Sequence, residues 1–464
     1  MAKACRIPRV MIAGTGSGCG KTSVTCAILR ALKDSGSDVC SFKCGPDYID
    51  PMFHSTITGS NAYNLDPFFL SENTLNSLLV QKGAGRDINI IEGVMGFYDG
   101  LGGGTTRASA WETAKITQAP VILITDTRGT SLSVLAVIQG FLNFVPESHI
   151  KGVILNRCSA GMYQTLSEAV KDHFQGEIEL LGYMPPMPDC SLENRHLGLV
   201  TPDEAEGLTE KVRKLGEQAG KTIDLPRLMD LAQSTPDLCA EPLPVRHFPE
   251  KIRIAYAKDK AFCFYYRENL ELLSAMGADL VPFSPVEAES LPPDIHGLYL
   301  GGGYPELHAA ALSANSPMRG SVRAALEAGL PCIAECGGYM YLTQSIDGFP
   351  MCGYLPGSCH GTGKLTRFGY IRMKAKTDNM LCDRGEEIPA HEFHYWDSDT
   401  AGDGFTAVKL SGKSWDCAFI SDRLYAGFPH FHFYADPELA PRFYRACLRY
   451  KENIHVRNNR SSGY

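Results

Sequence analysis

The chain has 464 residues, of which 44% are hydrophobic and 21% charged, and its formal net charge is −8. This length exceeds what one hydrophobic core usually serves, so we expect two domains, and the negative charge argues against a nucleic-acid surface, which needs clustered Lys and Arg. No apolar run approaches the roughly 18 residues of a membrane span and the start of the chain has no signal-peptide pattern, so we expect a cytoplasmic protein that binds neither nucleic acid nor membrane.

The first half alternates short apolar runs with longer amphipathic stretches. The predicted strands are Val10–Ala13, Val39–Phe42, Ile88–Ile91, Val121–Thr125, Val153–Leu155 and Ile178–Leu181. The predicted helices include Thr22–Lys33, Glu72–Gln81, Leu132–Leu142 and a polar stretch at Glu210–Gln233. This alternation predicts an α/β fold with a doubly wound parallel sheet, in which ligands bind at the carboxyl ends of the strands.

A glycine-rich segment, RVMIAGTGSGCGKTS, joins the first strand to the first helix. Glycines let backbone N–H groups surround phosphate oxygens, a lysine adds charge, and a threonine hydroxyl can reach Mg²⁺. The spacing departs from the usual phosphate loop, because Thr15 stands where the leading glycine is expected and Gly14 lies one residue earlier. We still predict an ATP site, formed by Gly14, Thr15, Gly16, Gly18, Gly20, Lys21, Thr22 and Ser23.

Acidic residues follow two of the predicted strands near this loop. Asp47 lies in KCGPDYIDP and Glu92 in INIIEGVMGFYDG, and Asp50 and Asp99 are further acids in the same segments. Hard oxygen ligands at strand ends beside a phosphate loop predict a Mg²⁺ site. Asn156 ends another strand, and its amide is either an adenine contact or a turn-forming group.

A second α/β series follows a proline-rich segment without periodicity. The boundary is predicted near 235–250, which gives an ATP-binding synthetase domain over 1–235 and a second domain over 250–448, with a disordered tail. The predicted strands are Ile252–Tyr256, Leu280–Phe283, Gly297–Leu300 and Cys332–Ala334, and the predicted helices are near Tyr265–Met276 and Ser321–Ala328.

The second domain has the pattern of a thiol nucleophile. Cys336 in PCIAECGGYMYL lies between a strand and a helix, where we expect an exposed thiol with a lowered pKa. The N–H groups of Gly302, Gly303 and their neighbour Gly301 are candidate oxyanion donors, and His430 or His432 is the candidate base. The other cysteines are interpreted as buried thiols. His391, Glu392 and His394 do not have zinc-protease spacing. The segment is predicted to be a strand, with His391 on one face and Glu392 and His394 on the other, that lines a substrate pocket.

Taken together, these segments resemble the cobyrinate a,c-diamide synthases of the cobalamin pathway along essentially the whole chain. The matching segments are GTGSGCGKTS, KCGPDYIDPMFH, EGVMGFYDG, VILNR, RHLGLVTP, LYLGGGYPEL, ECGGYMYL, RFGY and HEFHY. The resemblance implies a P-loop, dethiobiotin-synthetase-like domain followed by a class I glutamine amidotransferase-like domain. It also implies amidation of the a and c acetates of a corrin ring, with two ATP and two glutamines.

The resemblance also implies roles for individual residues. Thr22, Asp47 and Glu92 would bind Mg²⁺, and Tyr48, Asp50 and Asp99 would line the carboxylate site. Cys336 would be the nucleophile and His430 its base. Class I enzymes usually follow the histidine with Pro-Glu, whereas Phe431 and His432 stand here, so the third acid of the triad is missing, as it is in the cobalamin-type subgroup.

Alternatives share parts of this pattern. The acceptor is cobyrinate, hydrogenobyrinate or nickel sirohydrochlorin, and the sequence does not separate a monomer from a homodimer. A ParA/MinD-like regulatory ATPase is a rival of another class. That group has an extra lysine early in the phosphate loop, which Thr15, Gly16 and Ser17 do not supply, and it would leave the Cys336 domain unexplained.

Overall fold

A computed structural model describes residues 3–191, 194–195, 198–199 and 207–461. Part of the segment RHLGLVTP lies outside these residues. The chain divides into two compact units, Met1–Leu243 and Pro244–Tyr464, called the first and second unit below. Within the described residues, no helix combines the length and apolar character needed to cross a bilayer.

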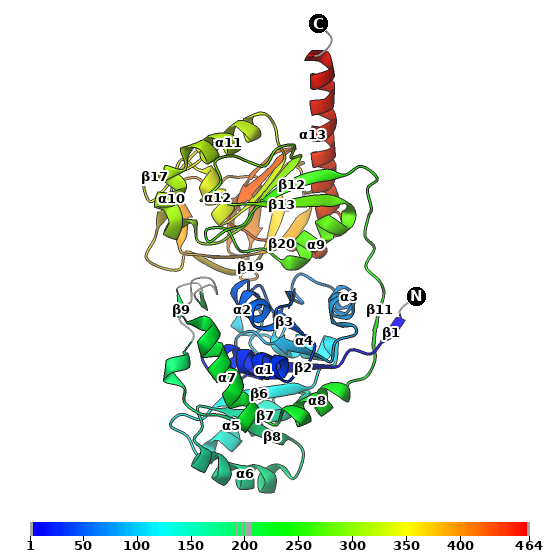
Figure 1. Ribbon diagram of the computed structural model, residues 1–464, viewed down its shortest axis with the longest axis vertical. Coiled ribbons are helices and arrows are strands. Elements are labelled where there is room, and N and C mark those ends of the chain that lie inside the picture. The colour runs from blue at the N-terminus through cyan, green and yellow to red at the C-terminus, as the bar shows by residue number, and fades with distance from the viewer. Residues whose placement is uncertain (1–2, 192–193, 196–197, 200–206, 462–464) are drawn as a thin grey trace. The chain divides into compact units, whose positions relative to one another are not determined.

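The first unit is built on a seven-stranded parallel sheet with the strand order β4-β3-β5-β2-β6-β7-β8 (Figure 1). The strands are β2 (Arg9–Gly14), β3 (Val39–Cys44), β4 (Ala62–Leu65), β5 (Ile88–Glu92), β6 (Val121–Asp126), β7 (Ile150–Asn156) and β8 (Glu179–Met184). β2, β3 and β5 are buried along their whole length, as expected of parallel strands covered on both faces. The glycine-rich loop therefore leaves the sheet at its centre.

Helices and short strands complete the first unit. The helices are α1 (Lys21–Asp34), α2 (Ile49–Thr58), α3 (Glu72–Gly83), α4 (Ala110–Thr117), α5 (Ser133–Asn143), α6 (Ala160–Phe174), α7 (Leu208–Thr222) and α8 (Leu225–Gln233), with short 3-10 turns η1 (Leu101–Gly103) and η2 (Pro188–Cys190). The short strands are β1 (Lys3–Cys5), β9 (Asn194–Arg195), β10 (Gly198–Leu199) and β11 (Leu238–Ala240). The single helix predicted over Glu210–Gln233 is two helices, because Asp224 caps α8 and Pro226 lies in its first turn.

The second unit has a six-stranded main sheet with the order β13-β12-β14-β15-β25-β24. Its strands are β12 (Ile252–Ala257), β13 (Ala278–Phe283), β14 (Gly297–Leu300), β15 (Cys332–Glu335), β24 (Phe419–Ile420) and β25 (Leu424–Gly427), and only the β24–β25 pair is antiparallel. The helices are α9 (Arg267–Met276), α10 (Ala309–Ala314), α11 (Ser316–Glu327), α12 (Gly337–Leu342) and α13 (Leu439–Ser461), with 3-10 turns η3 (Pro305–His308) and η4 (Phe433–Ala435). A disordered tail was predicted from Asn453 onward, and this prediction is wrong up to Ser461, because α13 extends to that residue.

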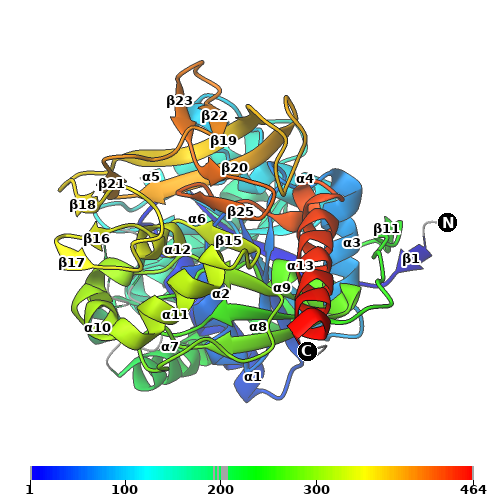
Figure 2. The same cartoon turned by 90° about the horizontal axis from the view of Figure 1, so that it is seen from above.

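Two smaller four-stranded sheets lie in the second unit and were not predicted from the sequence (Figure 2). One has the order β20-β19-β22-β23, with strands β19 (Arg367–Ala375), β20 (Glu387–His394), β22 (Phe405–Val408) and β23 (Ser414–Cys417). The other joins β16 (Ser345–Ile346), β17 (Phe349–Pro350), β18 (Cys359–Gly361) and β21 (Trp396–Ser398). His391 of β20 forms an isolated bridge with His430, so the first of these sheets reaches the predicted thiol site.

Candidate active sites

The loop between β2 and α1 has little room for side chains. A Cβ added to Gly14 would lie 2.3 Å from Cys19 Sγ, and one added to Gly20 would lie 2.0 Å from Asn156 Nδ2. Gly20 also has φ +95°, which disfavours any residue with a side chain. Both positions therefore require glycine in this conformation.

Lys21 begins α1 and turns back over the loop. Its Nζ donates a hydrogen bond to the Gly16 carbonyl at 3.2 Å, and the residue is only 8% exposed. Burial lowers the pKa of Lys21, because the charged amine has lost most of its water. A phosphate in the loop would restore favourable interactions for this cation.

Asn156, the last residue of β7, and Arg157, which follows it, hold the loop from the side. The Asn156 Nδ2 donates to the Cys19 carbonyl at 2.8 Å, and Arg157 donates to the Gly18 carbonyl at 3.1 Å while pairing with Asp126 at 2.6 Å. In this structure the Asn156 amide therefore stabilises the loop backbone. Its expected contact with an adenine edge stays a prediction.

Four polar side chains meet at the start of α1 and the carboxyl ends of β3 and β5. The Thr22 hydroxyl donates to Glu92 Oε1 at 2.8 Å and lies 3.2 Å from Asp50 Oδ2. Lys43 Nζ lies 2.5 Å from Asp50 Oδ2 and 3.0 Å from Glu92 Oε1. On the other side of Glu92, Oε2 lies 2.7 Å from His54 Nε2.

The charges in this cluster compensate one another. Burial opposes the charge of Lys43, but Asp50 and Glu92 outweigh that effect and raise its pKa well above the ordinary value. Burial likewise acts to raise the pKa of Glu92, whereas Lys43 and the His54 hydrogen bond lower it below its usual range. Burial, with Asp47 nearby, raises the pKa of Asp50. The cluster thus holds one firmly ionised carboxylate beside one firmly charged amine.

The carboxylates beside Thr22 are those of Glu92 and Asp50. Asp47 was expected to bind the metal, but its Oδ1 accepts hydrogen bonds from the N–H groups of Ile49 and Asp50, which caps α2, and its Oδ2 is 4.0 Å from Lys43. Asp50, which was expected at the substrate, is the second residue of α2, and its carboxylate lies beside Thr22.

The two other expected substrate residues are placed differently from each other. Tyr48 is buried and immediately precedes α2. Asp99 is exposed, and its Oδ2 accepts from the Gly96 N–H at 2.8 Å. Of these two residues, Asp99 is therefore the one that is exposed to solvent.

Lys43 and His54 were not identified from the sequence. Lys43 ends a buried apolar strand, and a lysine at such a position is itself a signal, since unpaired lysines are almost never buried. His54 is one turn beyond Asp50 on α2, which faces both side chains toward Glu92.

The donor set at this site is two carboxylates and a hydroxyl. Within the described part of the chain, no group of three or more His, Cys, Asp and Glu side chains is arranged to hold a metal ion alone. Mg²⁺ keeps several waters and usually takes one or two protein carboxylates together with phosphate oxygens. The residues present fit that kind of site.

In the second unit, Cys336 sits at a sharp turn between β15 and α12. Its φ is 47° and its ψ −103°, a strained conformation for a residue with a side chain. The turn is held by hydrogen bonds from the Cys336 N–H to the Gly427 carbonyl at 2.7 Å and from the Met340 N–H to the Cys336 carbonyl at 2.9 Å. The chain direction thus reverses at the thiol, as in the nucleophile turns of hydrolases.

The expectation of an exposed thiol with a lowered pKa is wrong for this structure. Cys336 is 8% exposed, and burial raises the pKa of its thiol, with Glu306 adding to the effect. A hydrogen bond from the Gly337 N–H opposes the shift without overcoming it. The helix that follows has only six residues, so its N-terminal partial charge is small.

The glycine loop after β14 lies between the cysteine turn and His430. A Cβ added to Gly302 would lie 2.6 Å from His430 Cε1 and 3.3 Å from Nε2, and one added to Gly337 would lie 3.2 Å from the Gly303 nitrogen. The loop is anchored by hydrogen bonds from the Cys263 and Phe264 N–H groups to the Gly302 carbonyl, each 3.0 Å. The Gly301 N–H already donates to Tyr265, which leaves Gly302 and Gly303 as the candidate oxyanion donors.

The two candidate histidines have different surroundings. His430 lies against Gly302, and its Nδ1 is 3.5 Å from Glu335 Oε2. His432 is 1% exposed, its Nδ1 accepts from the Tyr434 N–H, and burial lowers its pKa to about 3. The geometry favours His430 as the base.

The HEFHY segment forms the end of β20. His391 exchanges two backbone hydrogen bonds with His430, each 2.9 Å, and their rings meet edge to face at 5.1 Å. Glu392 is buried, which raises its pKa to about 7, and lies 4.0 Å from Arg367. His391 is therefore a neighbour of His430, and the substrate pocket expected along this segment stays a prediction.

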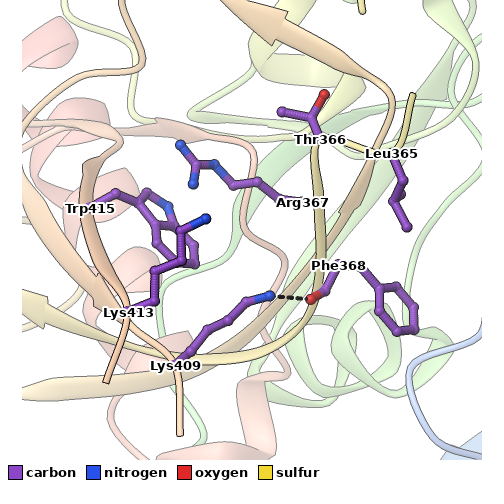
Figure 3. A pocket seen from close by; sticks show the side chains of 7 residues that line it. All are labelled: Leu365, Thr366, Arg367, Phe368, Lys409, Lys413 and Trp415. Atoms are coloured by element: carbon purple, nitrogen blue, oxygen red, sulfur yellow. Dashed lines mark hydrogen bonds between the residues drawn. The ribbon is translucent and has the colours of Figure 1, made fainter. Parts of the chain in front are cut away.

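A basic pocket opens on β19 in the second unit (Figure 3). Arg367 stacks on Trp415 at 4.3 Å from the ring centroid, and Lys409 donates to the Phe368 carbonyl at 2.6 Å. Lys413, Leu365 and Thr366 complete the lining. Cations beside aromatic rings can hold an anion carried on an apolar body.

Comparisons with known proteins agree with this arrangement. Residues 10–200 match the CobQ/CobB/MinD/ParA nucleotide binding domain, and residues 253–438 match the CobB/CobQ-like glutamine amidotransferase domain. Proteins named cobyrinate a,c-diamide synthase are similar over nearly the whole chain. That of Caldanaerobacter subterraneus subsp. tengcongensis is 40% identical (96% of this chain, 98% of the relative), that of Priestia megaterium 36% (96% and 98%) and that of Thermoplasma volcanium 37% (97% and 100%).

Proposed function

The chain belongs to the cobyrinate a,c-diamide synthase family, and we propose that it uses ATP and glutamine to convert the a and c acetate carboxylates of cobyrinate into amides. One observation carries this proposal: a single chain contains both a glycine phosphate loop with a buried Lys-acid cluster and a strained cysteine turn that packs on the same glycine loop as a buried histidine. The family's relatives match across both units, which supports one reaction that needs both sites.

The first unit would activate the carboxylate. Ammonia does not attack a carboxylate directly, so the γ-phosphoryl group of ATP is transferred to a carboxylate oxygen, giving an acyl phosphate and ADP. Such transfer depends on positioning and on neutralising phosphate charge, which the loop N–H groups, Lys21 and Lys43 provide. Thr22, Asp50 and Glu92 would hold Mg²⁺, which would neutralise phosphate charge when bound. Tyr48 and Asp99 remain proposed substrate contacts, and Asp47 is proposed to position α2.

The second unit would release ammonia from glutamine. His430 takes the thiol proton as Cys336 attacks the amide carbon, and Gly302 and Gly303 donate to the developing oxyanion. The C–N bond breaks, the leaving amine takes the proton from His430, and a glutamyl thioester remains. Water hydrolyses the thioester to glutamate, and the free ammonia displaces phosphate from the acyl phosphate.

The acceptor can be tested directly. The protein is incubated with ATP, Mg²⁺ and amide-¹⁵N-glutamine and, in separate reactions, with cobyrinate, hydrogenobyrinate or nickel sirohydrochlorin, and the added amides are counted by mass. We expect two labelled amides on cobyrinate. Amidation of nickel sirohydrochlorin or hydrogenobyrinate alone would reassign the substrate, and ATP hydrolysis without any amide would favour the ParA/MinD-like alternative.

A further inference from the structure

We propose that Glu335 is the acid partner of His430 and positions its imidazole for the reaction at Cys336. Glu335 is the last residue of β15 and directly precedes the nucleophile. Its Oε2 lies 3.5 Å from His430 Nδ1, and the two residues are 1% and 3% exposed. The inference rests on the proposed hydrolysis of glutamine by Cys336 and assigns the acid that the sequence pattern lacks.

The Glu335 carboxylate is fixed by two further contacts. Tyr299 lies in β14, and its hydroxyl donates to Oε2 at 3.2 Å. The Phe431 nitrogen lies 3.4 Å from Oε1 and donates its N–H to it. The second contact comes from the residue after His430, so the carboxylate is tied to the segment that carries the histidine. A buried carboxylate is costly unless it is paired, and here its partners are a phenol, an amide and His430.

The other titratable groups around His430 do not compete for this role. His391 meets the His430 ring edge to face, and burial lowers its pKa well below the ordinary value. His394 is also buried, which lowers its pKa to about 4. Glu306 and Glu392 are further acids near Cys336, and Glu392 pairs with Arg367 at 4.0 Å. Glu335 is the acid whose carboxylate lies at Nδ1 of His430.

This geometry selects one tautomer of His430. With a proton on Nδ1 directed toward Glu335, Nε2 is the basic nitrogen, and Nε2 is the atom nearest the Gly302 loop apart from Cε1. The same division of labour operates in Ser-His-Asp triads, where the acid holds the imidazole in the productive tautomer. The separation of 3.5 Å is longer than a good hydrogen bond, and such contacts often shorten when substrate binds.

The topology explains why the acid precedes the nucleophile. β15 and β25 are parallel neighbours, and Glu335 is in register with Gly427, three residues before His430. A side chain at the end of β15 therefore reaches the segment after β25. Phe431 and His432, which occupy the usual Pro-Glu positions, are buried in the core instead.

The test is glutamine hydrolysis without any tetrapyrrole, measured as glutamate release over a range of glutamine concentrations. In Glu335→Gln we expect kcat to fall about 10⁴-fold with little change in KM, as when a triad acid loses its charge. Glu335→Asp, which keeps the carboxylate, should recover part of kcat. A purely structural role would raise KM as well as lower kcat, and Glu335→Asp would not restore kcat selectively.

Glu268→Gln is the matched control. Glu268 is equally buried in the same unit and lies 4.0 Å from His432, a second glutamate–histidine pair that has no part in the proposal. We expect this variant to hydrolyse glutamine at the wild-type rate. A Glu335→Gln kcat within twofold of wild type, or a loss of kcat that Glu335→Asp does not partly recover, would overturn the proposal.

Tyr299→Phe covers the case in which Glu335→Gln does not fold. It removes one hydroxyl that orients Glu335, and we expect about a tenfold loss of kcat with KM unchanged. An unchanged kcat in this variant would count against Glu335. Because the assay needs no acceptor, a wild-type enzyme that hydrolyses glutamine but amidates no cobyrinate would refute the proposed acceptor and leave this inference standing.

Discussion

The two units position their reactive groups by opposite electrostatic means. The first unit buries charge: Lys43 and Glu92 lie 3.0 Å apart with almost no exposure, and each holds the other in its ionised form. In the second unit, burial instead keeps the thiol of Cys336 and the imidazole of His391 neutral at rest. Burial raises the pKa of Cys336, and it lowers that of His391.

The difference follows from what each site is proposed to bind. Nucleotide phosphates carry their own charge, so their binding site needs opposite charge in place beforehand. The amide of glutamine is neutral, and charge appears there only during the attack by sulfur. A thiol that stays protonated until substrate arrives also resists oxidation, because the thiolate is the reactive form. This contrast predicts that the two units fail separately when mutated.

The sharpest separation is expected from Cys336→Ala. Glutamine-dependent amidation should fall at least 10⁴-fold, roughly the effect of removing a catalytic nucleophile. Amidation with ammonium chloride should stay within about twofold of wild type, because the first unit needs only free ammonia. Both rates are measured by product mass, and Cys352→Ala, another buried thiol in the same unit, is the control. Loss of both activities in Cys336→Ala would contradict the separation.

Lys43→Met should have the complementary effect. We expect amidation to fall about 10³-fold with either nitrogen source, because the variant removes a positive charge from the phosphoryl-transfer site. Glutamine hydrolysis by the second unit should persist. Lys151→Met, an exposed lysine on β7, controls for loss of charge, and ADP release and glutamate release are the two measurements. Wild-type ADP release in Lys43→Met would remove this residue from the site.

A pH experiment sharpens the contrast in stability. His432 has a folded pKa of about 3, below its ordinary value, so the unfolded chain binds the extra proton between these values. Its stabilising contribution is present above about pH 6.5 and is lost on acidification, by about 3 kcal/mol at pH 4. Between pH 7 and pH 4, we expect the free energy of unfolding to fall by about 3 kcal/mol less in His432→Phe than in wild type. Hydrogen exchange measured on peptides of α9 and β20 follows the stability of the second unit.

Glu392 makes the wild-type slope alone uninformative. Its folded pKa is about 7, above the ordinary value, so acidification through that range stabilises the fold and opposes the effect of His432. The measure is therefore the difference between wild type and His432→Phe at each pH. An identical loss of protection in both proteins would show that His432 is not the group responsible.

The sequence predicted the parts of both sites that depend on local pattern. Each of these parts shows in a segment of about 15 residues or follows from the order of the strands. They are the apolar strands, the glycine loop with Lys21 and Thr22, Glu92 at a strand end, and the turn at Cys336. Their roles in binding and catalysis stay predictions until the variants are measured.

The rest depends on contacts between distant segments. The position of Asp50 beside Thr22 depends on where α2 begins, and Lys43 of β3 contacts Glu92 at the end of β5. Burial of Cys336 and the approach of Glu335 to His430 arise from the pairing of β15 with β25, which are about 90 residues apart in sequence. The strand that carries His391 was predicted, but no local pattern indicated its partners β19, β22 and β23 in the antiparallel sheet.

The smallest expected effect comes from Asn156, which has two possible roles. If its amide only supports the Cys19 carbonyl, Asn156→Ala should raise KM for ATP and for GTP equally, about tenfold for one lost buried hydrogen bond. If it reads the adenine edge, the loss should fall on ATP alone and preference over GTP should decrease. Asn143→Ala, an exposed residue at the end of α5, is the control. Because Gly20 leaves no room between loop and amide, we expect equal losses, and a selective loss for ATP would show that the amide turns toward the base once nucleotide binds.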